Sequence, residues 1–424
     1  MKNLPATLRA YRLFSYGAAP FLPFLLRRRL KRGKEDAARL NERLGRPSRP
    51  RPEGRLIWLH GASVGETMSI LPLVERLVAY GAVMLTTGTV TSAKLVESRL
   101  PAGAFHQFVP LDSPGAVARF FAHWKPDLGL LCESELWPNL IIEAHRQGIS
   151  LGIINGRMSD RSFRRWSKLR GFIRALLAPL AFCSAQSEGD AERYRALGAS
   201  SISPGNLKFD VPPLPFSADE FTSLRTQIGA RPVLVAASTH PGEESQVIEA
   251  ARAIAPDIPD LLTILVPRHP QRGEEIASLL REIGIPPLRR SLGAEPEKSV
   301  PFYIADTLGE LGLFYRLGTL ALIGGSLVEH GGHNPIEAIK CGCPCISGPH
   351  IDNFKDVFAD LVTEEGTKLF APGETLADGL RHLLDDPDAR SVLHAKASKA
   401  LAQHEGALER TIAALAPLLK PGGR

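Results

Sequence analysis

A long uninterrupted hydrophobic run is missing from this chain of 424 residues. The most apolar segment, Leu13–Leu26, is interrupted by Pro20 and Pro23 and is shorter than the roughly 20 residues that a helix needs to cross a bilayer. A cleaved signal peptide does not fit either. Its basic residues would precede the apolar run, whereas here the basic cluster Arg27–Lys34 follows it. Polytopic membrane proteins are therefore excluded as a class.

Cysteines are few as well. The five cysteines are odd in number and lack the spacing of a disulfide framework, which favours a reducing compartment. His330 and His333 lie near a C-x-C-x-C run, but this is not a zinc spacing and no second cluster completes it. We therefore expect no metal. Walker and dinucleotide-type glycine loops, internal repeats and low-complexity segments are also absent.

The composition is that of a soluble globular protein, with 44% hydrophobic and 23% charged residues. The length exceeds most single cores and predicts two domains. The net charge of +6 suits an anionic partner without identifying it.

Short apolar runs alternate with amphipathic segments from residue 55 onward. This pattern is typical of parallel strands covered by helices on both faces, so we predict an α/β fold of two doubly wound, Rossmann-like domains. A ligand would then lie in the cleft beyond the carboxyl ends of the strands. The predicted strands are 56–61, 83–88, 128–133, 150–156 and 181–186, then 233–238, 262–267, 302–305, 319–324 and 344–348.

Domain boundaries follow from composition. We predict a membrane-anchoring segment at 1–35, an N-terminal domain at 36–210, a proline-rich linker at 211–217 and a C-terminal domain at 218–424. The last helix of the C-terminal domain is a candidate to pack back on the N-terminal domain.

Glu66 follows the first predicted strand in the turn HGASVGE. One interpretation is structural: Ser63 caps a helix, and Glu66 completes an S-x-x-E capping box. The other is chemical: a carboxylate at a strand end is placed to act as a general base on a substrate hydroxyl. The local sequence leaves both interpretations open.

Further strand ends carry charged residues. Glu133 ends a buried run, where an unpaired carboxylate is costly, and alternation places Glu135 on the same face. Lys208, between apolar Leu207 and Phe209, is either a cation for an anionic substrate or a solvated lysine. Arg268 has the planar fork that suits a phosphate or carboxylate.

Two segments of the second half suggest anion binding. Asp306 is expected to cap a helix whose amides meet an anion. The glycine-rich stretch 321–350 precedes Asn334, Pro335, Ile336 and Glu337, which have the residue types of a helix start. Glu337 is either part of a capping box or an acceptor for ribose hydroxyls.

Basic residues cluster in two places. Arg157–Arg174 holds seven basic residues with interleaved aromatics, which suits a nucleic acid, a lipid phosphate or a solvated helix face; we favour the lipid and expect no nucleic acid. The segment 1–35 is either a membrane attachment, with Arg27–Lys34 at an anionic cytoplasmic leaflet, or a core helix, and we favour attachment.

With these residues in view, the chain resembles the Kdo transferases, the 3-deoxy-D-manno-octulosonate transferases of lipopolysaccharide synthesis. Six segments that look like signatures of that family occur in order, which is far more specific than any single motif. They are SVGE (63–66), ELWPN (135–139), LKFD (207–210), PRHP (267–270), DTLGEL (306–311) and GGSLVEHGGHNPIEA (324–338).

The resemblance implies a GT-B fold and an inverting, metal-independent transfer of Kdo from CMP-Kdo to an acylated, phosphorylated lipid A precursor (lipid IVA), with no cofactor. Glu66 would be the base, and Glu133 and Lys208 would stabilise the transition state. The enzyme would act at the cytoplasmic face of the inner membrane. The residues expected to hold the donor are Pro267, Arg268, His269, Leu308, Gly309, Glu310, Gly325, Ser326, Asn334, Pro335, Ile336 and Glu337.

Two other classes of function remain open at this point. One is a GT-B enzyme with a different nucleotide sugar, such as a UDP-sugar lipid glycosyltransferase or an epimerase. The other is a non-catalytic nucleic-acid or membrane-binding protein, which is supported only by Arg157–Arg174 and leaves Glu66 and Glu133 unexplained.

Overall fold

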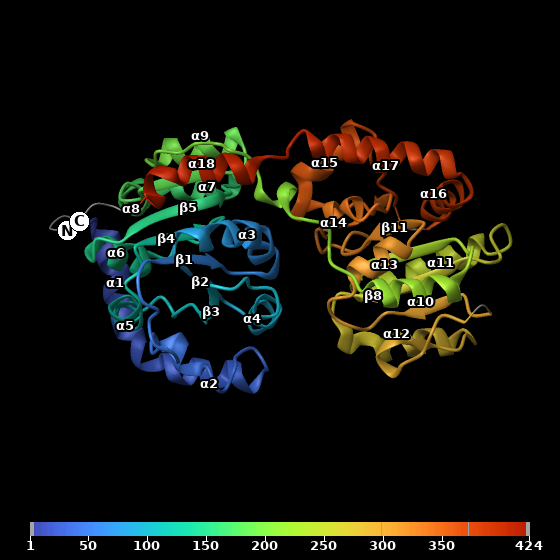
Figure 1. Cartoon of the computed structure of the whole chain (residues 1–424), viewed down its shortest axis with the longest axis horizontal. Helices are drawn as coiled ribbons and strands as arrows, with labels where there is room; N and C mark the ends of the chain where they lie inside the picture. Colours follow the sequence, from blue (N-terminus) through green and yellow to red (C-terminus); the bar gives the residue numbers. More distant parts are fainter. Residues whose placement is uncertain (1–3, 298, 372, 421–424) are drawn as a thin grey trace. The chain divides into compact units, whose positions relative to one another are not determined.

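The computed structural model describes residues 4–297, 299–371 and 373–420. The chain divides into two compact units (Figure 1): unit 1 comprises Met1–Val211 and His404–Arg424, and unit 2 comprises Pro212–Gln403. Residues 1–3 of the predicted anchoring segment lie outside the described residues, as do residues 298, 372 and 421–424 of the predicted C-terminal domain.

Unit 1 is built on a six-stranded sheet in the order β3-β2-β1-β4-β5-β6, and every neighbouring pair is parallel. The chain moves outward from β1 through β2 to β3 and then crosses to β4. Such a reversal opens a crevice at the carboxyl ends of the strands. The strands are β1 (Leu56–Gly61), β2 (Ala82–Thr87), β3 (Ala104–Phe108), β4 (Leu128–Cys132), β5 (Ser150–Gly156) and β6 (Phe182–Ala185).

Several helices of unit 1 begin at serine or threonine N-caps. Side-chain oxygens of Ser63, Thr89, Ser113, Ser159 and Ser187 accept hydrogen bonds from backbone N–H groups three residues further on. These bonds satisfy donors that a helix start leaves unpaired. The helices between the strands are α3 (Val64–Leu77), η3 (Val78–Tyr80), α4 (Val90–Glu97), α5 (Pro114–Trp124), α6 (Pro138–Arg146), α7 (Asp160–Lys168), α8 (Arg170–Leu177), α9 (Glu188–Leu197) and η4 (Leu207–Asp210).

The last helix, α18 (Ala407–Leu419), belongs to unit 1 although it follows unit 2 in the chain. Its residues Ala407, Leu415 and Leu419 are buried in the same core cluster as the strands of unit 1. Asp210 accepts hydrogen bonds from the backbone N–H groups of Gly406 and Leu408, which fixes the start of the helix. The second unit therefore ends at residue 403, short of the predicted 424.

The N-terminal segment forms α1 (Ala6–Ala18), η1 (Ala19–Phe21) and α2 (Leu22–Lys31), and η2 (Leu40–Leu44) follows. Leu8 and Leu26 are fully buried in unit 1, but Leu13 and Phe14 are each 75% exposed and Phe21 and Phe24 are each 71% exposed. Among the described residues, none of the helices combines the length and apolar character that crossing a membrane requires.

Unit 2 contains a second parallel sheet, in the order β12-β11-β7-β8-β10-β9. β7 is central, with β8 on one side and β11 on the other, so the loops after these strands meet at one edge. The strands are β7 (Val233–Thr239), β8 (Leu262–Pro267), β9 (Leu288–Arg289), β10 (Phe302–Ile304), β11 (Leu320–Ile323) and β12 (Cys345–Ser347).

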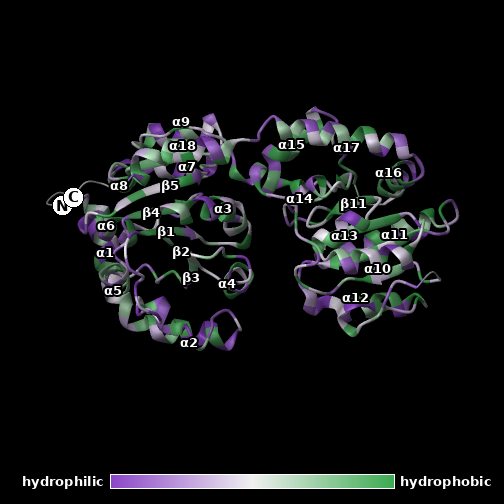
Figure 2. Ribbon diagram, viewed as in Figure 1, coloured by the Kyte–Doolittle hydropathy of each residue, from purple (hydrophilic) through white to green (hydrophobic). Residues whose placement is uncertain are grey.

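Helices cover this sheet, and the hydrophobic residues concentrate in the strands and on the inner faces of the helices (Figure 2). Cys343 and Cys345, from the C-x-C-x-C run of the sequence, are fully buried core residues. The helices are α10 (Ala218–Ile228), α11 (Glu243–Ile254), η5 (Pro270–Arg272), α12 (Gly273–Glu282), η6 (Arg290–Leu292), α13 (Leu311–Leu317), α14 (Pro335–Lys340), η7 (Asp352–Phe354), α15 (Lys355–Thr363), α16 (Glu374–Asp385) and α17 (Pro387–Ala402).

Candidate active site

Glu66 lies on the first turn of α3, directly after β1, and makes contacts like those of a capping box, except that its carboxylate reaches the N–H of Ala62, the residue before the cap. Its backbone N–H donates to Ser63 Oγ at 3.3 Å, and Ser63 Oγ donates back to Glu66 Oε1 at 2.9 Å. Its second oxygen, Oε2, accepts from the backbone N–H of Ala62 at 2.8 Å. The structural interpretation of Glu66 is therefore correct, and these bonds hold the carboxylate at the carboxyl end of the sheet.

The environment of Glu66 raises the pKa of its carboxyl group above the ordinary value. Burial is the largest cause, and the negative charge of Glu133 is the next; the bonds from Ala62 and Ser63 act in the opposite direction. A carboxylate with a raised pKa binds a proton more readily, which is the property that a general base needs. Capping and proton transfer are thus compatible roles of this side chain.

Glu133 follows β4 and forms an ion pair with Lys208. Lys208 Nζ lies 2.7 Å from Glu133 Oε1, and the two side chains are 15% and 14% exposed. Glu133 has φ = +57°, in the left-handed region that a residue with a Cβ seldom adopts. Its amide N–H donates to Ile154 O at 3.0 Å. Backbone strain of this kind often occurs at functional sites.

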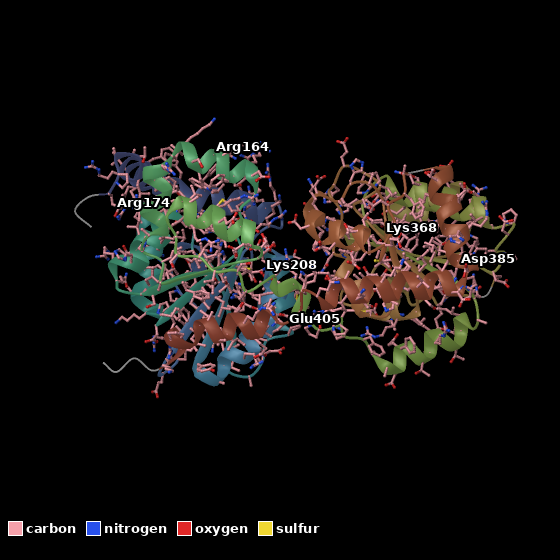
Figure 3. The ribbon with its side chains drawn as sticks, turned by 90° about the horizontal axis from the view of Figure 1, so that it is seen from above. Arg164, Arg174, Lys208, Lys368, Asp385 and Glu405 are labelled. Carbon is pink, nitrogen blue, oxygen red and sulfur yellow. The ribbon has the colours of Figure 1, made fainter. Side chains whose placement is uncertain are left out.

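Lys208 is positioned by polar groups at the ends of β5 and β6. Leu207 is buried, and its N–H donates to Asn155 Oδ1 at 2.9 Å, while the Lys208 N–H donates to Asn206 Oδ1 at 3.0 Å. Gln186 Nε2 donates to both Glu133 Oε1 and Asn155 O. Figure 3 labels Lys208 within unit 1. The ends of β4, β5 and β6 therefore contribute to one hydrogen-bonded cluster.

Glu135 joins this cluster from the other side. Its Oε2 lies 3.8 Å from the fully buried His60 Nε2 and accepts a hydrogen bond from the indole N–H of Trp137. Burial raises the pKa of Glu135, but His60 and Trp137 outweigh that effect and hold the pKa below its ordinary value. The charge of Glu135 also raises the pKa of Glu66. Glu133 and Glu135 thus have different partners, Lys208 and His60, and both carboxylates raise the pKa of Glu66.

In unit 2, four histidines gather with Arg268 at the carboxyl ends of β7, β8 and β11. They are His240, His269, His330 and His333. His240 Nε2 and His333 Nε2 lie 2.8 Å apart and share one hydrogen bond, and the rings of His240 and His330 have centroids 3.7 Å apart. Burial, followed by the charge of Arg268, lowers the pKa of His333 to about 3. Burial, followed by His330, lowers the pKa of His240 to about 4. Both rings are therefore neutral at pH 7, and Arg268 supplies the positive charge.

The buried carboxylate of Glu243 shapes the glycine loop after β11. It accepts hydrogen bonds from the backbone N–H groups of Gly325, Ser326 and Leu327, at 2.6 to 2.9 Å, and from that of His240 at 2.8 Å. Ser326 is fully buried, and its hydroxyl donates to Ile323 O. The resemblance assigned Gly325 and Ser326 to the donor, but their backbone N–H groups are already bound to Glu243. These two residues build the loop and do not present their polar groups to a ligand.

The predicted DTLGEL site is rearranged relative to expectation. Asp306 does not cap a helix: α13 begins five residues later, and the Asp306 carboxylate accepts from Arg289 Nε and from the Ser291 N–H, each at 2.9 Å. The Glu310 carboxylate pairs with Arg290. Leu308, in contrast, is 76% exposed.

A small cavity of about 300 Å³ lies beside this loop. Its lining includes Leu308, Gly309 and Glu310 together with the aromatic ring of Phe216. Gly309 adopts φ = +87°, which a residue with a side chain would reach only with strain. Three residues predicted to hold the donor, Leu308, Gly309 and Glu310, therefore line this cavity.

Helix α14 begins where the sequence predicted a helix start, with Asn334 as its N-cap. Asn334 Oδ1 accepts from the Ile336 N–H at 3.1 Å, Pro335 occupies the first turn, and Asn334 Nδ2 donates to Glu337 Oε1 at 3.4 Å. The helix has only six residues, so its dipole is small. Pro335 and Ile336 are buried, whereas Asn334 and Glu337 are partly exposed.

Sequence reasoning missed several of these residues. His60, Asn155, Gln186, His240 and Glu243 all follow or end strands, so their place at a strand's carboxyl end was the available signal. Asn155 and Ser238 share the positive φ of Glu133, at +52° and +61°.

Within the described residues, no group of three or more His, Cys, Asp or Glu side chains is arranged to hold a metal.

Comparison with known proteins agrees with this arrangement. Residues 38–211 match the family described as 3-deoxy-D-manno-octulosonic-acid transferase (kdotransferase), and residues 289–400 match glycosyl transferases group 1. The 3-deoxy-D-manno-octulosonic acid transferase of Haemophilus influenzae is 35% identical over 393 residues, which cover 90% of this chain and 92% of that protein. The corresponding protein of Bordetella pertussis is 36% identical over 420 residues, covering 96% and 98%.

Among solved structures, a putative UDP-N-acetylglucosamine 2-epimerase from Listeria monocytogenes is similar with a TM-score of 0.57. The match covers 87% of this chain and 97% of that chain at 15% identity, so it concerns the fold alone. Two parallel six-stranded sheets with such neighbours confirm the predicted GT-B fold.

Proposed function

The chain belongs to the Kdo transferase family of lipopolysaccharide synthesis, and we propose that it moves Kdo from CMP-Kdo to an acylated, phosphorylated lipid A precursor. The single observation that carries this proposal is the Glu66–Glu133–Lys208 cluster of unit 1, where one carboxylate with a raised pKa lies beside an ion pair. The cluster fits a transferase, in which the base deprotonates an acceptor hydroxyl beside charges that stabilise the departing phosphate, and the family match favours this reaction over epimerisation.

In the proposed reaction, Glu66 accepts the proton of the acceptor's primary hydroxyl as that oxygen forms a bond to the anomeric carbon of Kdo. The bond from this carbon to the phosphate oxygen breaks, and CMP leaves with the electron pair. Attack from the face opposite the leaving group inverts the anomeric carbon. The capping bonds from Ser63 and Ala62 would hold the base in place without reorganisation during the step.

Glu133 and Lys208 would stabilise the charges that develop as the bond to CMP breaks. Positive charge grows on the sugar ring and negative charge on the leaving phosphate, and fixed charges in a partly buried site act strongly on both. The ion pair itself keeps the Glu133 carboxylate oriented, and Gln186 adds a second bond to the same oxygen.

Unit 2 would hold the donor. Arg268 is exposed at the end of β8 and offers a guanidinium to the phosphate. His269 is adjacent, and Pro267 fixes the end of the strand. The loop Leu308–Glu310 with its cavity, and the segment Asn334–Glu337 with its partly exposed polar side chains, are the proposed contacts to the rest of CMP. No metal or cofactor enters this scheme.

We place the enzyme at the cytoplasmic face of the inner membrane. The exposed apolar residues of α1 and α2 and the basic cluster Arg27–Lys34 support contact with an anionic lipid surface, and Arg157–Arg174 supports an anionic lipid substrate. Flotation of the full chain with anionic and with neutral vesicles tests this placement. Binding to neither kind of vesicle would contradict it.

The direct test is an incubation with radiolabelled CMP-Kdo and the lipid A precursor, followed by thin-layer chromatography. The proposal predicts a Kdo-bearing glycolipid, formed at an unchanged rate in the presence of EDTA. Turnover of a UDP-sugar with no product from CMP-Kdo would overturn the proposal in favour of the alternative donor.

A further inference from the structure

Unit 1 contains an apolar groove with a volume of about 700 Å³. One wall is the outer face of α1, with Ala10, Tyr11 and Phe14. The opposite wall is formed by the start of α6 and by the junction between α7 and α8. The residues of this second wall include Leu136, Trp137, Pro138, Trp166, Leu169 and Phe172.

The groove is held open by fixed contacts. Tyr11 OH donates to Asp112 Oδ2 at 2.9 Å, and the same carboxylate accepts from the backbone N–H groups of Asn139 and Leu140, so α1 and the start of α6 share one buried anchor. The rings of Trp166 and Phe172 are stacked with centroids 5.9 Å apart. A ligand would therefore meet a preformed surface, which lowers the entropy lost on binding.

A polar pocket of about 360 Å³ adjoins the groove. The two share Trp166 and Leu169 as a common wall, while Ser134, Ser162 and Arg165 line the polar side. Ser134 is the residue between Glu133 and Glu135. The turn that carries Glu133 and Glu135 therefore also contributes a residue to the pocket, and the pocket shares a wall with the groove.

Charge distinguishes the two compartments. Helix α7, which lines the polar pocket, carries four exposed basic residues: Arg161, Arg164, Arg165 and Lys168. The groove, in contrast, is lined almost wholly by apolar and aromatic side chains. Figure 3 labels Arg164 on this helix. A ligand that suits both compartments carries an anionic polar head and an apolar chain.

We propose that the groove binds one fatty acyl chain of the acceptor, and that Arg165 in the adjoining pocket contacts the acceptor's phosphate. This inference rests on the proposed function and deepens it. The acyl chain runs between α1 and the Trp166–Phe172 stack, and the sugar hydroxyl that receives Kdo lies toward the Glu133–Glu135 turn. Binding of the acyl chain in the groove thereby selects acylated acceptors and orients the reacting hydroxyl.

Steady-state kinetics in mixed micelles tests the groove with three variants of the full chain. Ala10→Phe fills the groove and Phe14→Ala removes part of its wall; each is expected to raise KM for the acylated acceptor about 10-fold or more. Leu13→Ala is the matched control, because Leu13 is as exposed as Phe14, at 75%, but does not line the groove. KM for CMP-Kdo should stay at the wild-type value in all three.

The phosphate contact is tested by Arg165→Gln against Arg164→Gln. The first should raise KM for the phosphorylated acceptor and leave KM for a dephosphorylated acceptor unchanged. The second removes a charge of the same basic surface that does not line the pocket, so its smaller effect should be the same for both acceptors. Unchanged kinetics in Arg165→Gln, or equal effects of the two substitutions, would show that a diffuse basic surface acts in place of a phosphate site.

Occupancy of the groove is measured without turnover by titrating tryptophan fluorescence with the acylated acceptor and with its deacylated form. Wild type should give a saturable change with the acylated form alone, and Phe14→Ala should weaken it about 10-fold. Equal effects of Leu13→Ala and Phe14→Ala, or wild-type binding in Ala10→Phe, would overturn the proposal. A wild-type protein that binds the acylated form but transfers no Kdo would contradict the proposed function and leave the groove assignment supported.

Discussion

Lys208 Nζ lies 2.7 Å from Glu133 Oε1, and this ion pair links the turn after β4 to η4. Both side chains are largely withdrawn from water, at 15% and 14% exposed. Partial burial makes the partner essential to each charge, because a carboxylate left without its cation would face the nearby Glu66 and Glu135 alone. The pair is therefore a structural element of the cluster as well as a proposed catalytic one.

Replacing Lys208 by methionine is expected to reduce kcat roughly 100-fold and to destabilise unit 1 by about 2 kcal/mol. Adding Glu133→Gln to the Lys208→Met protein should recover much of the lost stability, because no unpaired charge remains, but should not recover turnover. Denaturant unfolding and initial rates measure the two effects. Recovery of activity in the double variant would show that the pair acts only as a structural link.

The capping role of Glu66 is isolated by comparing Glu66→Gln with Glu66→Ala. Neither variant carries a charge at this position, and only glutamine keeps an oxygen that accepts from the Ala62 N–H. We expect Glu66→Ala to be less stable than Glu66→Gln by about 1 kcal/mol. Equal stabilities in denaturant melts would contradict the capping assignment.

The raised pKa of Glu66 also predicts how stability depends on pH. A carboxyl group whose pKa is higher in the folded than in the unfolded state is harder to ionise after folding, so its ionisation destabilises the protein. Glu66→Gln should therefore be more stable than wild type near neutral pH. The difference should disappear as pH falls below the ordinary carboxyl value of 4.5, where both states are protonated. A difference that grows on acidification would contradict the sign.

The same pKa predicts the acid limb of the activity profile. Because a base works only when ionised, kcat/KM should rise with pH along a limb above 4.5. The charge of Glu133 is the second cause of the raised pKa, so Glu133→Gln should move the limb to lower pH even though the rate itself falls. A limb at the same pH in this variant would show that another group controls it.

Glu243 is expected to be indispensable to unit 2. Its carboxylate accepts from four backbone N–H groups, and alanine would leave these donors unpaired in the interior. Glu243→Ala should lose at least about 3 kcal/mol of stability and most of the affinity for CMP. Glu249→Ala, at an exposed position of the same helix, is the matched control and should change little. Calorimetric titration with CMP measures the affinities, and an undiminished affinity in Glu243→Ala would contradict its role.

The sheets were largely predictable because a strand buried on both faces needs an uninterrupted apolar run, as in Leu56–Gly61 and Leu262–Pro267. β3 was missed because its sequence, AFHQF, contains two polar residues. His106 is paired by Thr87 and Arg39, which come from other parts of the chain. The residues next to His106 in the sequence therefore do not indicate that its ring is hydrogen-bonded inside the protein.

The site was predictable in part for the same reason. Glu66, Glu133 and Arg268 stand at strand ends, where polar residues after an apolar run indicate function. Gly325 and Ser326 were assigned to the donor by the family resemblance, but the acceptor of their amides, Glu243, lies far away in the sequence. Asp306 likewise resembles a helix cap until Arg289 is seen beside it.

A single-turnover assay of Glu66→Gln with radiolabelled CMP-Kdo and the acylated acceptor tests whether Glu66 is the base. Glutamine keeps an oxygen for the capping bond and removes the proton acceptor, so we expect a folded protein that binds CMP and the acceptor with wild-type affinity but forms no Kdo glycolipid. Product formation at the wild-type rate would contradict the assignment of Glu66 as the base.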